Sequence, residues 1–179
     1  MRRALIAAAL LMAAAAAALA QQVRPADRAV IEACLAKESD GPQRCLGAVY
    51  TPCTEAPQTD ADRVPPGSTA GRGDCAERET AVWWEILDAN LKKLREGPLG
   101  QTVAQPWNRP PQNKRDRAVP GTDIIDDMQA TWVNWRAKKC DTAAMQYEEG
   151  TLSRVIYATC IYEETGRQAL WLKALVEDR

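Results

Sequence analysis

The chain contains no histidine among its 179 residues, and this absence excludes several kinds of active site. A Ser-His-Asp triad, a Cys-His nucleophile pair and a histidine-bound metal all require an imidazole. Hydrolysis would depend instead on paired carboxylates or on a serine–lysine pair, and neither occurs in a recognisable motif. These absences leave no recognisable hydrolytic site, and we expect the chain to hold neither a metal nor a cofactor.

Phenylalanine is also absent, and β-branched residues rarely occur in runs. No segment alternates apolar and polar residues over the length of a strand, whereas several segments repeat apolar residues every three or four positions. The sequence therefore predicts an all-α fold, a small helical bundle of four to five helices.

The first 20 residues have the pattern of a secretory signal peptide. A basic start, Met1-Arg2-Arg3, precedes an apolar run over 4–19 that ends in a small-x-small cleavage motif. The run is short, consists mostly of alanine and is followed by two glutamines, which disfavours a membrane anchor. Lipid attachment is disfavoured because the first cysteine is Cys34. We expect cleavage after Ala20, a periplasmic location without membrane insertion, and a single domain over 21–179.

An excess of basic residues is lacking as well. The chain has 23 Lys and Arg against 24 Asp and Glu, and without the two arginines of the signal peptide there are 21 against 24, a net charge of −3. Nucleic-acid-binding domains typically carry a basic patch. We therefore expect no nucleic-acid partner.

All six cysteines lie after the predicted cleavage point, at Cys34, Cys45, Cys53, Cys75, Cys140 and Cys160. An even number of cysteines in an oxidising compartment predicts three disulfides, for which fifteen pairings are possible. Proximity in sequence favours Cys34–Cys45 and Cys53–Cys75. A zinc site is disfavoured because the chain has neither a CxxC motif nor a histidine.

Five segments are predicted to be helical, namely 25–39, 42–50, 74–97, one from about 122 and one over about 152–176. The clearest of them begins with an Asp74-x-x-Glu77 capping box and ends at Gly97. Its expected buried stripe comprises Thr80, Trp84, Leu87, Leu91 and Leu94, with Trp83 widening it. Two stretches rich in proline, glycine and polar residues, 54–73 and 98–121, are expected to be long irregular loops.

The stretch MQATWVNWRAKKC, residues 128–140, lies on the helix predicted from about residue 122. The face expected to enter the core carries Ile125, Met128, Trp132 and Trp135. Gln129 and Arg136 fall at the edge of this face. We expect them to form a hydrogen-bonded border of the core, with Arg136 stacked on Trp132, rather than to contact a partner.

The loop over 98–121 carries Trp107 among proline and polar residues. One interpretation is a surface insertion without further role, and the other is a recognition loop, because tryptophan commonly anchors protein interfaces. The candidate partner-binding residues are Trp107, Arg109, Lys114, Arg115 and Arg117.

The order of several motifs resembles the LprI-type lysozyme-inhibitor family of exported bacterial domains. That pattern has a C-x-x-x-E helix start, a W-x-x-x-L stretch, a Q-x-x-W-x-x-W-R…C helix, a G-T turn and a cysteine on the last helix. The matching residues are Cys75, Glu79, Trp83, Leu87, Gln129, Trp132, Trp135, Arg136, Cys140, Gly150, Thr151 and Cys160. The resemblance extends over roughly residues 30–175.

The resemblance implies an exported, disulfide-stapled protein that is not an enzyme and in which Cys140 pairs with Cys160 across the turn between the last two helices. It also implies a lysozyme as partner, bound so that the inhibitor occludes the acidic cleft of the enzyme, and loop 98–121 is the candidate for insertion. The alternative is a periplasmic module that binds another envelope protein and has no effect on lysozyme. The sequence does not separate these two functions.

Overall fold

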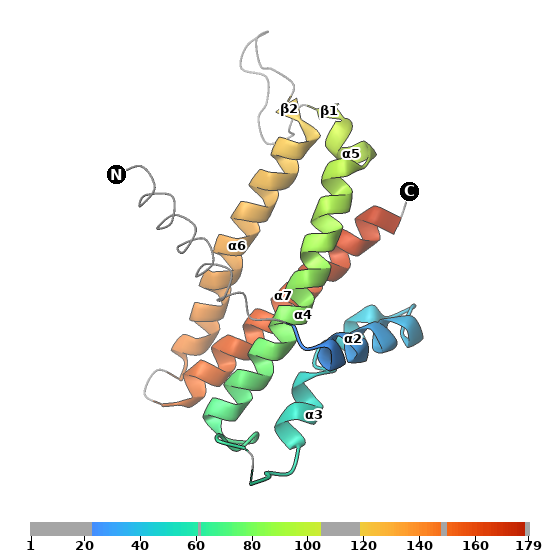
Figure 1. Ribbon diagram of the computed structural model, residues 1–179. Helices are drawn as coiled ribbons and strands as arrows, with labels where there is room; N and C mark the ends of the chain where they lie inside the picture. Colours follow the sequence, from blue (N-terminus) through green and yellow to red (C-terminus); the bar gives the residue numbers. More distant parts are fainter. Residues whose placement is uncertain (1–22, 61, 105–118, 148–149, 178–179) are drawn as a thin grey trace, which may run out of the picture.

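The computed structural model describes residues 23–60, 62–104, 119–147 and 150–177. Three long helices dominate the fold in Figure 1, namely α4 (Thr69–Glu96), α6 (Gly121–Met145) and α7 (Leu152–Glu177). Helix α7 packs most extensively against α4 and next against α6, whereas α4 and α6 have few contacts with each other. The predicted signal peptide and its cleavage point lie outside the described residues.

The shorter elements cover one side of this three-helix frame. Helix α2 (Pro25–Lys37), the 3₁₀ turn η1 (Pro42–Cys45) and helix α3 (Tyr50–Glu55) pack on α4 and α7. After α4 comes the single turn of α5 (Pro98–Gln101), and then β1 (Val103–Ala104) pairs antiparallel with β2 (Val119–Pro120). Apart from this two-residue pairing, the described residues form an all-α bundle, which confirms the predicted fold class.

The second predicted helix, over 42–50, is wrong. The chain forms η1, turns at Gly47, whose φ is +93°, and then begins α3 before Pro52 rather than ending there. Pro52 is tolerated because it is the third residue of α3, within the first turn, where backbone N–H groups have no partner inside the helix.

The predicted start of α4 at Asp74 is also wrong, although its end at Gly97 is confirmed. The helix begins five residues earlier, and its N-cap is Ser68, whose Oγ accepts a hydrogen bond from the backbone N–H of Gly71 at 3.1 Å. A side chain at Gly71 would collide with the carbonyl oxygen of Pro65, so the preceding loop can pack closely on the first turn only because this residue is glycine.

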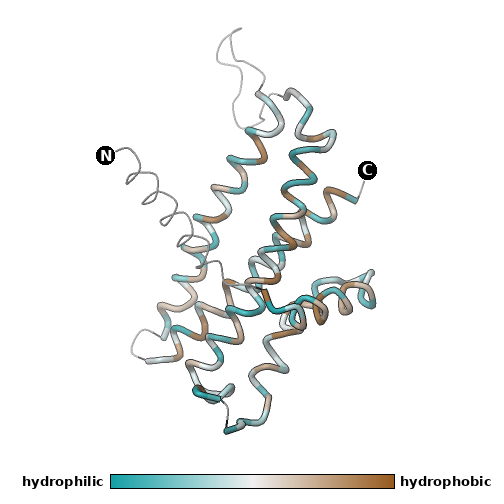
Figure 2. The backbone as a smooth tube through the Cα atoms, in the orientation of Figure 1, coloured by the Kyte–Doolittle hydropathy of each residue, from teal (hydrophilic) through white to brown (hydrophobic). Residues whose placement is uncertain are grey.

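The core lies along the contact between α4 and α7. Figure 2 shows apolar and polar residues alternating along each long helix, as expected of helices that bury only one face. Trp83 and Leu87 are fully buried, whereas Thr80 and Trp84 are half-buried, so the predicted stripe is displaced toward Trp83. Gly166 of α7 faces this contact, and a Cβ there would lie 3.0 Å from the Trp83 ring.

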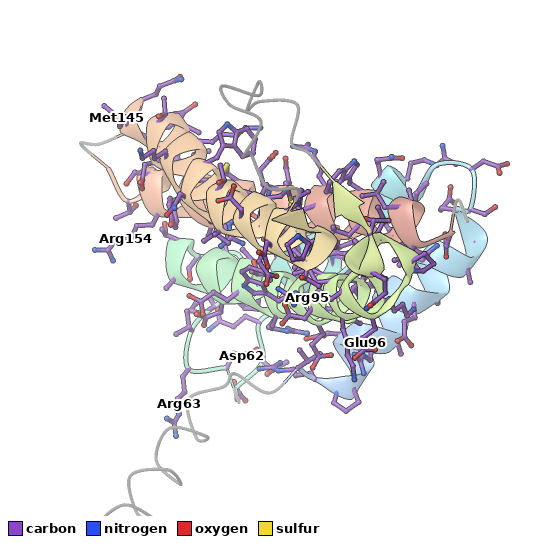
Figure 3. The ribbon with its side chains drawn as sticks, turned by 90° about the horizontal axis from the view of Figure 1, so that it is seen from above. Asp62, Arg63, Arg95, Glu96, Met145 and Arg154 are labelled. Atoms are coloured by element: carbon purple, nitrogen blue, oxygen red, sulfur yellow. A yellow bond between two sulfur atoms is a disulfide. The ribbon has the colours of Figure 1, made fainter. Side chains whose placement is uncertain are left out.

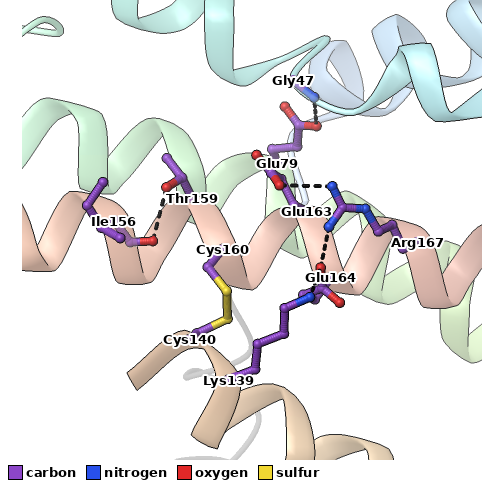
Figure 4. A network of polar contacts seen from close by, with 10 residues as sticks. All are labelled: Gly47, Glu79, Lys139, Cys140, Ile156, Thr159, Cys160, Glu163, Glu164 and Arg167. Carbon is purple, nitrogen blue, oxygen red and sulfur yellow. Dashed lines mark hydrogen bonds and ion pairs between the residues drawn. A yellow bond between two sulfur atoms is a disulfide. The ribbon is translucent and has the colours of Figure 1, made fainter. Parts of the chain in front are cut away.

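Three disulfides connect the elements, and they are the pairs expected from the sequence. Cys34–Cys45 joins α2 to η1, Cys53–Cys75 joins α3 to α4, and Cys140–Cys160 joins α6 to α7. The last bridge is drawn in Figure 4, where it links the two helices directly. Each of the three long helices is therefore bonded covalently to another element.

Candidate functional site

A buried carboxylate, Glu79, organises the turn between η1 and α3. Its side chain is 0% exposed, and one oxygen accepts hydrogen bonds from the Gly47 N–H at 2.6 Å and the Trp83 indole at 3.0 Å. The second oxygen accepts from the Val49 N–H at 3.1 Å and the Tyr50 N–H at 2.7 Å. Figure 4 shows the bond to Gly47. Because all four acceptor positions are filled, Glu79 has a structural role.

Arg136 lies between two tryptophan rings at the contact of α6 with α4 and α7. Its guanidinium carbon is 4.8 Å from the ring centres of both Trp84 and Trp132, and its Nη1 donates to Thr165 Oγ1 at 2.7 Å. The stacking expected on Trp132 is therefore present, with a second ring on the other helix. Burial lowers the pKa of Arg136, and neighbouring Tyr157 acts in the opposite sense. No described carboxylate forms an ion pair with Arg136.

Gln129 also lies at the border of the core, where its Oε1 accepts a hydrogen bond from Gln168 Nε2 at 3.4 Å. Trp135, in contrast, was predicted to be in the core and is 49% exposed, so that prediction is wrong. The face of α6 toward α7 follows Trp132, Arg136 and Cys140, which leaves Trp135 on the outside. There its ring is covered by the Lys139 ammonium at 4.9 Å.

A groove lies between α4 and α7 and reaches Trp84, which packs against the core. It consists of two adjoining hollows that share Glu77, Tyr157 and Ala158, and their volumes are about 670 Å³ and 660 Å³. We call them together the α4–α7 groove. Its residues come mainly from α4, α7 and the last turns of α6, together with Val23 before α2 and Thr151 before α7. They include Asp74, Ala81, Trp84, Glu85, Asp88, Asp141, Arg154, Tyr157, Ala158 and Ile161.

Most charged residues of the groove are acidic. Glu85 forms an ion pair with Arg28 at 2.5 Å. Burial raises the pKa of Asp88, and the more distant Arg95 acts against this shift. Arg95 itself is bound to Asp126 at 2.6 Å. The carboxylate of Asp88 is thus partly removed from water, and no cation in the described part of the chain forms an ion pair with it.

Comparison with known families identifies the chain. The family described as "Lysozyme inhibitor LprI" matches residues 53–172, about two thirds of the chain. The chain belongs to the LprI family. A search of curated proteins and a search of solved structures returned no match.

The residues that carry the LprI resemblance in the sequence are mostly interior in this LprI-family protein. Glu79, Trp83, Arg136 and Cys140 are buried, and Trp132 packs against the core. Beside the Cys140–Cys160 bridge, buried Glu164 binds Lys139 at 3.0 Å and also pairs with Arg167 (Figure 4). The Cys140–Cys160 bridge and the Lys139–Glu164 pair hold α6 against α7. The buried residues of the shared pattern therefore specify the scaffold.

The candidate partner-binding residues Trp107, Arg109, Lys114, Arg115 and Arg117 lie outside the described residues. The structure does show where their segment is attached. Its two ends meet in the β1–β2 pairing, where Ala104 faces Val119, and the Gly121 N–H donates to the Thr102 carbonyl at 2.7 Å. Ala104 and Val119, the two residues that flank 105–118, therefore lie next to each other, between α5 and the start of α6 in the chain.

The described part of the chain shows neither a metal centre nor a membrane span. No group of three or more Cys, Asp or Glu side chains there could hold a metal ion. Among the helices of that part, none combines the length and the hydropathy needed to cross a membrane. What the groove offers chemically is an acidic, partly aromatic surface.

Proposed function

We propose that this LprI-family protein is an exported, non-enzymatic lysozyme inhibitor that acts in the periplasm by binding the enzyme and occluding its cleft. The observation that carries the proposal is the match of the LprI family over residues 53–172. Three disulfides support export, because such bonds persist in oxidising compartments.

The segment over 105–118 is our candidate for the part that enters the cleft. This segment is attached to the bundle at Ala104 and Val119, which are paired with each other in the β1–β2 ladder. It includes Trp107, a residue type that commonly anchors interfaces, and Arg109, which would face the carboxylates of the cleft.

The test is a cell-wall lysis assay with purified protein and representatives of the different lysozyme types. We expect the protein to slow lysis by at least one type at micromolar concentration. A variant in which Asn-Gly replaces 105–118 should lose this effect, since a two-residue turn of this kind closes an antiparallel pair without disturbing β1 and β2.

Trp107→Ser is the matched point variant, and it should weaken inhibition while the helical circular dichroism spectrum stays unchanged. If no lysozyme type is slowed at a micromolar excess of the protein, the proposal is wrong. Capture of another envelope protein from a periplasmic extract would then favour the alternative function.

A further inference from the structure

The carboxylates of the α4–α7 groove exceed the cations that could neutralise them. Asp74, Asp88 and Asp141 are exposed, and none of the three forms an ion pair with a residue that the structure describes. Arg154 is the only cationic residue among the described residues of the groove, and it projects away from the helices in Figure 3. The groove therefore has unpaired negative charge.

The dimensions of the groove suit an extended polypeptide. Fourteen positions separate Asp74 from Asp88 on α4, which corresponds to roughly 21 Å along the helix axis. This length equals about six residues of extended chain. Asp141 adds a third carboxylate from α6, across from Asp74. A chain lying in the groove would meet carboxylates near both of its ends.

Between these carboxylates the surface is mostly apolar, although Glu77, Thr80 and Glu85 also line it. Ala81, Ala158 and Ile161 contribute small or aliphatic side chains, and Trp84 and Tyr157 contribute rings. Lysine and arginine side chains fit this combination because their hydrocarbon stems cover apolar surface while their charged ends remain near carboxylates or ring faces. An acidic segment would be repelled.

We propose that the α4–α7 groove is a docking surface for an extended segment of a partner protein that carries lysine or arginine side chains. This inference deepens the proposed function and rests on it in one respect, the identity of the partner. A lysozyme could supply such a segment, because common lysozymes are basic. The chemistry of the segment follows from the groove alone. A metal is not the occupant, since no cluster of ligands within the described residues could hold one.

The test compares two variants with the same change in net charge. The groove variant is Asp74→Asn/Asp88→Asn/Asp141→Asn. The control is Asp40→Asn/Glu55→Gln/Asp60→Asn, three exposed positions outside the residues of the groove. Because all six positions are exposed, both variants should keep the circular dichroism spectrum of the unmodified protein.

The probe is a fluorescein-labelled twelve-residue peptide of alternating lysine and serine, and its anisotropy is measured at low ionic strength. We expect the dissociation constant to rise at least about tenfold for the groove variant and less than about twofold for the control. Equal weakening in both variants would show that net charge alone binds the peptide. That result, or an absence of binding by the unmodified protein, overturns the inference.

The same three proteins are then assayed against the lysozymes, which separates the two proposals. If only the groove variant binds the peptide more weakly and none of the three proteins inhibits a lysozyme, the docking surface is supported and the proposed function is refuted. If all three proteins inhibit a lysozyme, and the groove variant differs from the control neither in peptide binding nor in inhibition, the proposed function is supported and the docking surface is refuted.

Discussion

The hydrogen bonds of Glu79 predict that Glu79→Gln destabilises the protein strongly despite its nearly identical shape. The carboxylate accepts from three backbone N–H groups and the Trp83 indole; three of these four hydrogen bonds are buried, and that from Tyr50 is partly buried. Glutamine has one oxygen, so its amide NH₂ must face two of these donors. Leaving two buried donors without an acceptor costs about 1–3 kcal/mol each, which gives a loss of about 2–6 kcal/mol.

Urea unfolding of the disulfide-intact protein, followed by circular dichroism, measures this loss. The control is Glu96→Gln on the same helix, where the side chain is 67% exposed and its ion pair with Lys92 is 3.9 Å long. We expect the control to change the free energy of unfolding by less than about 0.5 kcal/mol.

Glu79→Leu tests whether the effect on stability comes from the hydrogen bonds of Glu79 or from its buried charge. It removes the buried charge, which alone would be neutral or favourable, but it also leaves all four donors without an acceptor. We therefore expect a loss at least as large as for Glu79→Gln. A loss below about 1 kcal/mol in either variant would refute the assignment of Glu79 as the acceptor that holds this turn.

Three further predictions concern stability in the same urea assay. Gly166→Ala should destabilise the protein by about 1–3 kcal/mol because the new Cβ meets the core. Gly73→Ala should stabilise it by about 0.5–1 kcal/mol, because a Cβ there has no neighbour within 4 Å. A change in stability of the same sign for both variants would contradict the packing of α7 on α4. Replacing Cys140 and Cys160 by serine should cost about 3 kcal/mol, since the bridge closes a loop of 20 residues; a change below about 1 kcal/mol would count against this. Because burial raises the pKa of Asp88 in the folded protein, its charge opposes folding above that pKa and the penalty disappears as pH falls. Asp88→Asn should accordingly stabilise slightly at neutral pH and not at acidic pH, and a destabilised variant at neutral pH would contradict this.

Helical periodicity was sufficient to predict the three long helices, because each has an amphipathic pattern over many turns. The start of α4 was not predictable in this way. Gly71 and Gly73 weaken local helix propensity, and the requirement for Gly71 comes from a loop carbonyl that reaches it only in the folded chain. Tertiary packing therefore overrides the local signal there.

The position of each tryptophan depended on details that spacing does not resolve. Trp132 and Trp135 are separated by three residues, and the direction in which α7 crosses α6 decides which of them is covered. The sequence placed Arg136 beside Trp132, but its second ring, Trp84, belongs to another helix. The α4–α7 groove was not predicted for the same reason, since it exists only where α4, α6 and α7 meet.

The interior position of the LprI pattern determines how a loss of inhibition must be interpreted. Arg136 is buried between two rings, and lysine would lose both the planar stacking and the bond to Thr165. Any loss of inhibition in Arg136→Lys should therefore be accompanied by a loss of stability. Changes in residues 105–118 or in the acidic residues of the groove should leave stability nearly unchanged. Only variants of this second kind can assign a partner to a surface of this LprI-family protein.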